Sequence, residues 1–94
     1  MDIKEQLKGD RVLIDFYATW CGPCKLMEKQ LEKYSEEVSE VSVVKIDVDE
    51  NSEASNAFGV RSIPTLIYME KGEVINKTTG AQSLQQLKEF TNVG

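Results

Sequence analysis

Hydrophobic residues along the chain fall into patterns that alternate between those of strands and those of helices. The stretch Val12–Ala18 is almost continuously apolar, which is typical of a strand buried on both faces. Between Pro23 and Val38, apolar side chains recur every third or fourth position, which predicts an amphipathic helix whose buried stripe is formed by Met27, Leu31, Tyr34 and Val38. Pro23 suits the first turn of that helix, where a backbone N–H has no partner within the helix and its absence therefore costs no hydrogen bond.

The remaining segments continue the alternation. Val41–Val48 predicts a second strand, Ser52–Phe58 a short helix closed by Gly59, and Thr65–Met69 with Val74–Thr79 a β-hairpin around residues 70–73. Ser83 opens the last helix, and Gln86 three residues later completes a capping box. The buried stripe of this helix is expected to be Leu84, Leu87 and Phe90. A further short helix is predicted at Asp2–Lys8, where Ile3 and Leu7 share a face.

The order of elements is therefore helix, strand, helix, strand, helix, strand, strand, helix. A strand–helix–strand unit over Val12–Val48 requires a right-handed crossover and parallel pairing, whereas the hairpin adds antiparallel strands. The sequence thus predicts an α/β fold with one mixed four-stranded sheet and helices on both faces. With 94 residues, the chain is long enough for one domain, residues 1–94, and too short for two.

Charge and composition exclude several classes of function. The net charge of −5 disfavours direct contact with nucleic acid, because the domain repels phosphate backbones. No stretch approaches the roughly 18 apolar residues of a membrane span, and the charged N-terminus lacks the apolar run of a signal peptide. We therefore expect a cytoplasmic protein, in a compartment where thiols are kept reduced. We also expect it to be a monomer. The absence of histidine excludes Cys–His nucleophile pairs and most mixed zinc sites.

The candidate chemistry lies in Trp20-Cys21-Gly22-Pro23-Cys24-Lys25, at the junction between the first strand and the long helix. Residues three apart on a helix lie close together, so the two sulfurs can meet without distorting the fold. The helix N-terminus offers free N–H groups and a partial positive charge, which would stabilise a thiolate on Cys21 and lower its pKa below about 8.5.

The two cysteines are not expected to be equivalent. Cys21 precedes the helix and is predicted to face solvent, whereas Cys24 lies in the first turn and is predicted to be covered. Cys21 would attack a substrate disulfide, and Cys24 would then resolve the mixed disulfide. Two other interpretations are weaker. A zinc half-site completed by dimerisation is disfavoured because the chain has no second cysteine pair and no histidine, and a structural disulfide would close a loop too small to constrain much.

These residues together resemble the thioredoxin family. The resemblance rests on the motif above following an Asp-Phe-Tyr-Ala strand, on Ile63-Pro64-Thr65 downstream, and on Gly80-Ala81 after the hairpin. It covers almost the whole chain, from about Leu7 to Val93. It implies a thioredoxin fold and a protein-disulfide reductase with no cofactor or metal, whose partners are disulfide-containing proteins and a thioredoxin reductase linked to NADPH or ferredoxin.

The resemblance also implies roles for further residues. Asp15 matches a buried aspartate beneath the disulfide, which exchanges a proton with Cys24 and whose pKa is raised by burial. Lys45 matches a lysine near that carboxylate, although an ordinary exposed strand lysine is an equally open interpretation. Pro64 matches a cis-proline, and the backbone of Ile63 would pair with an extended substrate segment. The exposed docking patch is expected to comprise Trp20, Gly22, Pro23, Ile63, Pro64, Gly80 and Ala81.

The chain departs from the family pattern at several positions. It begins near the family's first helix, so the strand over Val41–Val48 is expected to be a bare sheet edge, blunted by Lys45 and Asp47. Such an edge would lower the stability of the fold or be covered by a partner. Lys29 stands where a helix-kinking proline is usual, which predicts a straighter helix. Ser62 and Thr79 make the docking patch more polar.

Three functions remain open on sequence alone. The first is a general protein-disulfide reductase, which the Gly22-Pro23 pair between the cysteines favours, because intervening residues tune the balance between dithiol and disulfide. The second is the same chemistry run as a thiol oxidant or isomerase. The third is an accessory binding module that uses the docking patch without redox turnover.

Overall fold

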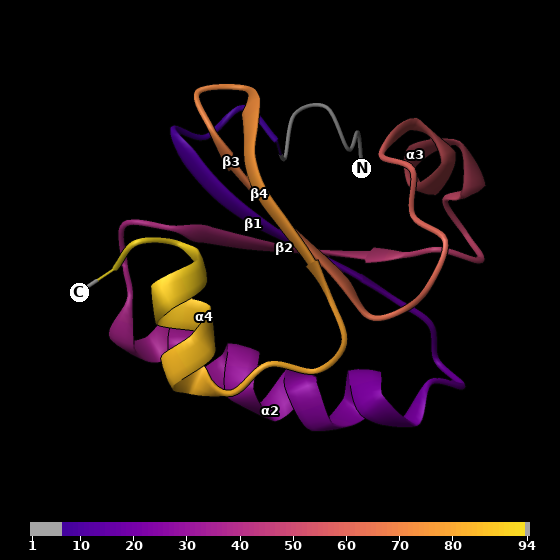
Figure 1. Cartoon of the computed structure of the whole chain (residues 1–94), viewed down its shortest axis with the longest axis horizontal. Helices are drawn as coiled ribbons and strands as arrows, with labels where there is room; N and C mark the ends of the chain where they lie inside the picture. The colour runs from indigo at the N-terminus through magenta and orange to yellow at the C-terminus, as the bar shows by residue number, and fades with distance from the viewer. Residues whose placement is uncertain (1–6, 94) are drawn as a thin grey trace.

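The computed structural model describes residues 7–93, whose chain forms one four-stranded mixed sheet covered by helices (Figure 1). The strands lie in the order β2-β1-β3-β4, with β1 parallel to β2 and antiparallel to β3. This is the predicted sheet. Its strands are β1 (Arg11–Tyr17), β2 (Ser42–Asp47), β3 (Thr65–Glu70) and β4 (Glu73–Thr79), and its helices are α2 (Gly22–Glu37), α3 (Ser52–Ala57) and α4 (Leu84–Phe90).

The central strand β1 divides the hydrophobic core into two layers, because its side chains point alternately to opposite faces of the sheet. Leu13 packs with α2 and α4, in a cluster that includes the predicted stripe Met27, Leu31, Tyr34 and Val38. Val12, Ile14 and Phe16 pack on the other face, towards Ala54 and Phe58 around α3. Asp15 therefore belongs to the same face as Leu13, beneath α2.

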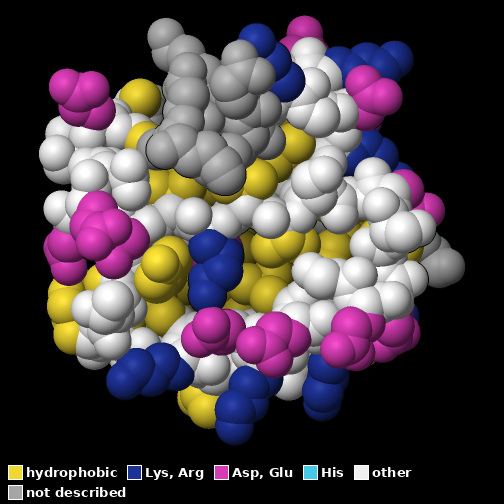
Figure 2. All heavy atoms as spheres, turned by 180° about the vertical axis from the view of Figure 1, so that it is seen from behind, with side chains coloured by type: hydrophobic (Ala, Val, Ile, Leu, Met, Phe, Trp, Pro, Cys, Tyr) yellow, Lys and Arg dark blue, Asp and Glu magenta, His cyan; other side chains and the backbone are white. Residues whose placement is uncertain are grey.

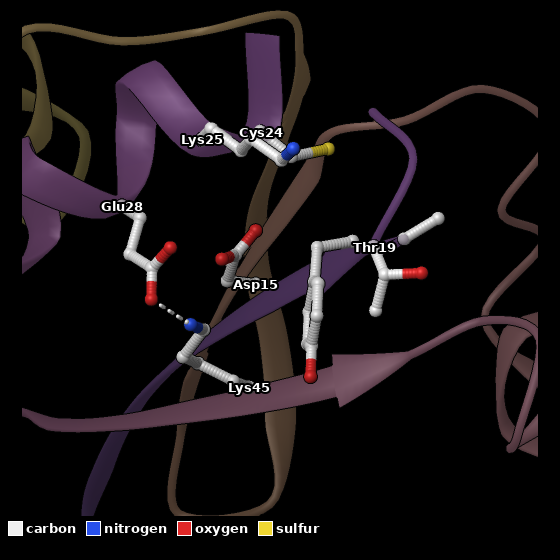
Figure 3. A pocket seen from close by; sticks show the side chains of 8 residues that line it. Asp15, Thr19, Cys24, Lys25, Glu28 and Lys45 are labelled. Atoms are coloured by element: carbon white, nitrogen blue, oxygen red, sulfur yellow. Dashed lines mark hydrogen bonds and ion pairs between the residues drawn. The ribbon is translucent and has the colours of Figure 1, made fainter. Parts of the chain in front are cut away.

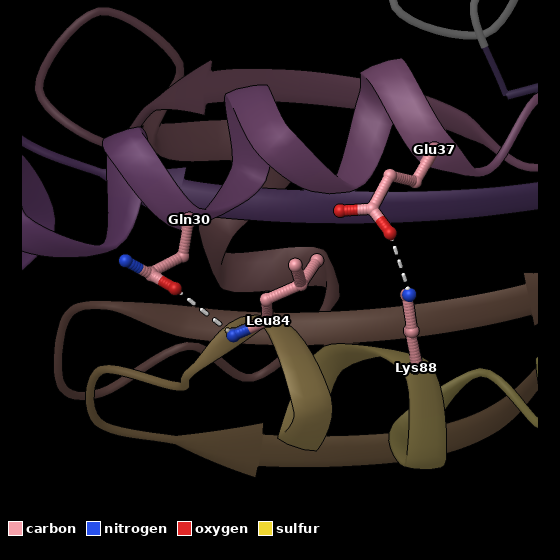
Figure 4. A network of polar contacts seen from close by, with 4 residues as sticks. All are labelled: Gln30, Glu37, Leu84 and Lys88. Atoms are coloured by element: carbon pink, nitrogen blue, oxygen red, sulfur yellow. Dashed lines mark hydrogen bonds and ion pairs between the residues drawn. The ribbon is translucent and has the colours of Figure 1, made fainter.

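Helix α4 is fixed to α2 by polar contacts as well as by its apolar stripe (Figure 4). The predicted capping box is present: Ser83 accepts a hydrogen bond from the Gln86 N–H, and the Gln86 side chain accepts one from the Ser83 N–H. The backbone N–H of Leu84 donates to Gln30 on α2 at 3.0 Å. Lys88 forms an ion pair with Glu37 at 2.8 Å. The capping box and the bond to Gln30 satisfy N–H groups at the helix start that the helix itself leaves without partners, and the ion pair adds a second link between the two helices.

The predicted element boundaries agree with the structure to within one or two residues. Gly59, which was expected to close α3, has φ +67°, a left-handed conformation that suits glycine. Helix α2 continues without interruption through Lys29, where a proline would have disturbed it. The predicted helix at Asp2–Lys8 lies largely outside the described residues, and the part that is described, Leu7 and Lys8, lies in a turn.

Strand β2 forms one edge of the sheet within residues 7–93, as predicted. Lys45 is exposed there, but the expectation that Asp47 also blunts the edge is wrong. The Asp47 side chain is buried and accepts hydrogen bonds from the N–H groups of Asp49 and Glu50, so it caps the turn after the strand. Among the described residues, no helix is long and apolar enough to cross a membrane.

Candidate active site

Cys21 and Cys24 lie at the N-terminus of α2 and are joined by a disulfide. Cys21 is the N-cap residue, with an extended backbone, and its Sγ accepts a hydrogen bond from the Cys24 N–H at 3.2 Å. A sulfur in this position takes the place of the oxygen that usually caps a helix. The Cα atoms are 5.3 Å apart, within the ordinary range for a disulfide, which confirms that the predicted spacing brings the sulfurs together.

Cys21 is less accessible than the sequence suggested. Only 4% of its surface is exposed, compared with 3% for Cys24, so the prediction that Cys21 faces solvent is wrong. Both cysteines pack with Ala18, and Tyr17, Val48 and Ile63 lie against this small cluster. Tyr17, Val48 and Ile63 belong to three different segments of the chain. The disulfide to Cys24 and this packing together cover Cys21, which was expected to be open to solvent.

Beneath the disulfide lies a pocket of about 280 Å³, shown in Figure 3, that reaches from Cys24 to the buried Asp15. Asp15 is 1% exposed, and within residues 7–93 neither of its carboxylate oxygens has a hydrogen-bond partner. Burial raises the pKa of the Asp15 carboxyl to about 6; the charge of Lys45 opposes this rise, and that of Glu28 adds to it. The carboxyl is therefore able to take up and release a proton near neutral pH.

Lys45 reaches this pocket from β2, in direct register with Asp15 on β1. Its ammonium forms an ion pair with Glu28 on α2 at 2.8 Å and lies 4.8 Å from the centre of the Tyr17 ring. Partial burial disfavours its charged form, but the hydrogen bond and the charge of Glu28, with help from Asp15 and Tyr17, leave the pKa of Lys45 raised. The same hydrogen bond lowers the pKa of Glu28.

The residues predicted to dock substrates surround the disulfide end of the sheet, but they are not all exposed. Five of them are open to solvent, namely Trp20, Gly22, Pro23, Gly80 and Ala81. Ile63 is half-buried, and Pro64 is buried, so the expectation that Pro64 lies in an exposed patch is wrong. The Ile63–Pro64 peptide bond is cis, as predicted. The Pro64 carbonyl accepts a hydrogen bond from the Gly80 N–H at 2.9 Å, which holds the two loops together.

Two features near the disulfide were not found from the sequence. The Trp20 indole N–H donates a hydrogen bond to Asp49 at 2.9 Å, and a hollow of about 270 Å³ opens beside Trp20 and Ile63. Glu28, which stands among the charged residues of its helix in the sequence, lines the pocket of Asp15. Asp49 and Glu28 each meet partners at least 17 residues away in the chain, so no local pattern marks them.

Comparison with known proteins agrees with this geometry. The thioredoxin family profile matches residues 2–93. The chain is 48% identical over 82 residues to thioredoxin from Listeria monocytogenes (86% of this chain, 80% of the relative) and 45% identical over 82 residues to thioredoxin from Bacillus subtilis (86% and 79%).

Solved structures give the same result. A mutant thioredoxin from Halobacterium salinarum superimposes with a TM-score of 0.87 at 38% identity, covering 95% of this chain and 82% of that one. Oxidised mitochondrial thioredoxin 3 from Saccharomyces cerevisiae superimposes with a TM-score of 0.85 at 36% identity, covering 95% and 84%.

Proposed function

Because this chain belongs to the thioredoxin family of dithiol–disulfide oxidoreductases, we propose that it reduces disulfides in substrate proteins through Cys21 and Cys24. The observation that carries the proposal is the position of the pair at the start of a 16-residue helix, with the Cys24 N–H directed at the Cys21 sulfur. A thiolate on Cys21 would gain this hydrogen bond and the favourable end of the helix dipole, which together favour the thiolate over the thiol.

The reaction proceeds by two thiol–disulfide exchanges. The Cys21 thiolate attacks one sulfur of the substrate disulfide, forming a mixed disulfide and expelling the other substrate sulfur as a thiolate. Cys24 then attacks the Cys21 sulfur, closes the intramolecular disulfide and releases the remaining substrate thiolate. Two electrons pass from the dithiol to the substrate. The protons that Cys21 and Cys24 lose pass to solvent, and the two substrate thiolates take up protons from solvent.

Asp15 is the proposed base for the second exchange. Cys24 must lose its proton before it can attack, and the pocket that joins it to Asp15 has room for several waters at about 30 Å³ each. A proton can then pass from the Cys24 thiol to the Asp15 carboxylate and later to solvent. A carboxyl with a pKa of about 6 is well matched to this exchange near neutral pH. Lys45 contributes a nearby positive charge.

Substrate docking is assigned to the surface around the disulfide. Trp20 supplies an exposed aromatic face, with Gly22, Pro23, Gly80 and Ala81 open beside it, and Ile63 lies partly exposed next to the buried Pro64. An extended substrate segment would pair with the Ile63 backbone by strand addition. The chain would act as a monomer in the cytoplasm, where a thioredoxin reductase linked to NADPH or ferredoxin returns it to the dithiol form.

Reduction of insulin, followed as turbidity with a thioredoxin reductase and NADPH, tests the proposal. The expected result is catalytic turnover by the wild-type protein and none by a Cys21→Ser, Cys24→Ser double variant. Turnover that survives loss of both thiols would contradict it. A reduction potential near that of oxidising folding catalysts, measured by glutathione equilibration, would instead favour the oxidant or isomerase interpretation.

A further inference from the structure

The pocket beneath the disulfide contains two carboxylates that compete for Lys45. Asp15 and Lys45 are register partners on adjacent strands, so their side chains emerge on the same face of the sheet. Even so, the ammonium of Lys45 bonds to Glu28, and both oxygens of Asp15 remain without a hydrogen-bond partner within residues 7–93. Figure 3 shows Lys45 directed towards Glu28 at the side of the pocket, with Asp15 between Lys45 and Cys24.

The exposure of the three groups explains this choice of partner. The side chains of Lys45 and Glu28 are 38% and 48% exposed, so their ion pair keeps much of its hydration. Asp15 is 1% exposed, and a bond to it would bring the ammonium to the buried end of the pocket, away from bulk solvent. Desolvation of an ammonium is costly, so a partner at the rim is favoured over one at the bottom.

Few other groups act on Asp15. The titratable or charged side chains that line its pocket come from three elements and are Tyr17 on β1, Cys24, Lys25 and Glu28 on α2, and Lys45 on β2. Its register partner on β3 is the apolar Leu66. Among the lining groups, Lys45 and Glu28 are the two whose charges act on the Asp15 carboxyl, in opposite directions.

We propose that Glu28 is a positioning residue for the redox reaction, which holds the Lys45 ammonium at the rim of the pocket and so keeps it from binding the Asp15 carboxylate. The inference rests on the proposed function of Asp15 as the base that accepts the Cys24 proton. A carboxylate bonded to an ammonium is a poorer proton acceptor than one without such a partner. Glu28 therefore preserves the basicity of Asp15 for the step in which Cys24 attacks Cys21.

Glu28 lies along one border of a second hollow, between α2 and β2, which has further acidic side chains at Glu32 and Glu36. Figure 2 shows the molecule from behind, where acidic side chains gather beside apolar ones. Glu32 lies one helical turn beyond Glu28 and borders that second hollow, but it does not line the pocket of Asp15. It therefore offers a matched control with the same charge on the same helix.

The test is a direct titration of the Asp15 carboxyl by ¹³C NMR in the oxidised protein. Glu28→Gln keeps the shape of the side chain but removes its charge. Lys45 is then released to Asp15, and the pKa of Asp15 should fall by about one pH unit, at the low end of the effect of an opposite charge within 4–6 Å. Glu32→Gln should leave the pKa of Asp15 unchanged. In reduced protein, the pH profile for decay of the mixed disulfide should shift in the same direction as the titration.

Repeating the titration in a Lys45→Met variant separates the effect of Glu28 on the position of Lys45 from the direct effect of its charge on Asp15. In a Lys45→Met protein there is no ammonium to hold, so Glu28→Gln should move the Asp15 titration by less than half as much as it does in the wild type. An unchanged titration in Glu28→Gln, or an equal shift in both backgrounds, would overturn the inference. If the titrations follow expectation but the wild type reduces no protein disulfide, the proposed function fails and the role of Glu28 in placing Lys45 survives.

Discussion

Asp15 and Lys45 face one another across the parallel strands β1 and β2, but the aspartate is buried without a hydrogen bond from any of residues 7–93, and the lysine bonds to Glu28 at the pocket rim. A buried carboxyl in this setting is costly to ionise, because the energy of moving its charge out of water is not recovered from a partner. The site thus keeps a destabilising group where the proposed chemistry needs a proton acceptor, and the cost of that group is measurable.

The first prediction is that Asp15→Asn stabilises the oxidised protein at pH 7. The pKa of Asp15 is raised from its ordinary 3.8 to about 6, and at about 1.4 kcal/mol per pH unit this corresponds to a penalty of about 3 kcal/mol in the ionised form. Asparagine cannot ionise and so avoids this penalty. The unfolding free energy of the Asp15→Asn protein should therefore exceed that of the wild type by up to this amount. Urea unfolding at pH 7 measures the difference.

The pH dependence of that difference follows from linkage. Between about pH 4 and pH 6, the folded wild type retains a proton on Asp15 that the unfolded chain has released, so its stability falls as pH rises through this range. Below about pH 4 both states are protonated and the penalty disappears. The advantage of Asp15→Asn should therefore vanish at low pH and reach its full size above about pH 6. An advantage that is the same at pH 4 and pH 8, or that also appears in the exposed Asp10→Asn variant, would contradict this explanation.

The second prediction distinguishes the two cysteines. With Cys21 as the attacking thiol, Cys24→Ser should still form the mixed disulfide but should be unable to resolve it. Mass spectrometry of Cys24→Ser mixed with a disulfide-bonded protein should therefore detect a covalent adduct on Cys21, whereas Cys21→Ser should accumulate much less. Multiple turnover should be lost in both variants. Equal trapping by the two variants would show that the sulfurs do not have separate roles.

Most of the fold was predictable because each helix and strand has a characteristic local pattern in the sequence. The stripe at Met27, Leu31, Tyr34 and Val38 has the period of a helix, and all four side chains lie in one core cluster. The capping pair Ser83 and Gln86 lies three residues apart and needs no tertiary partner. The disulfide was likewise predictable from the spacing of the cysteines, because one turn of a helix places the two residues close together.

Partners that meet across the fold were not predictable in the same way. Glu28 has the sequence context of a solvated helix residue, and its bond to Lys45 exists because α2 crosses over β2. The burial of Cys21 depends in part on Ile63, which lies 42 residues later in the chain. Local patterns predict which face of an element is buried, but they do not say which side chain of another element covers it.

The third prediction concerns Trp20 and Asp49. The indole N–H bonds to the Asp49 carboxylate at an exposed site, so Asp49→Ala should cost no more than about 1 kcal/mol of stability. It should nevertheless free the Trp20 ring and raise KM for protein disulfides several-fold, while reduction of a small disulfide such as lipoamide stays unchanged. Trp20 is the only tryptophan in the chain, so its fluorescence reports the change directly. Glu50→Ala is the matched control, and an unaltered emission spectrum together with an unaltered KM would refute the proposed role of the bond.

The fourth prediction concerns the turn between β3 and β4, at the end of the sheet away from the disulfide. Lys71 and Gly72 both have positive φ, at 51° and 84°, as in the two-residue hairpin turn that favours Asn-Gly. Lysine adopts this conformation at a cost that asparagine largely avoids, so Lys71→Asn should stabilise the protein by up to about 1 kcal/mol. Gly72→Ala should destabilise it by about 1 kcal/mol. Beyond the adjoining residues, no atom in the described part of the chain lies within 4 Å of the added Cβ, so the effect is conformational.

The register of the sheet makes the same turn a test of how local these effects are. Glu70, just before the turn, pairs with Arg11 at the start of β1, whereas Thr65 pairs with Phe16 near the end that leads to the cysteines. Neither turn variant should therefore change kcat or KM for disulfide reduction, although the two should move the midpoint of thermal unfolding in opposite directions. Equal midpoints for Lys71→Asn and Gly72→Ala would show that backbone conformation at the turn does not limit stability. A change in activity would show that the far end of the sheet is coupled to the disulfide.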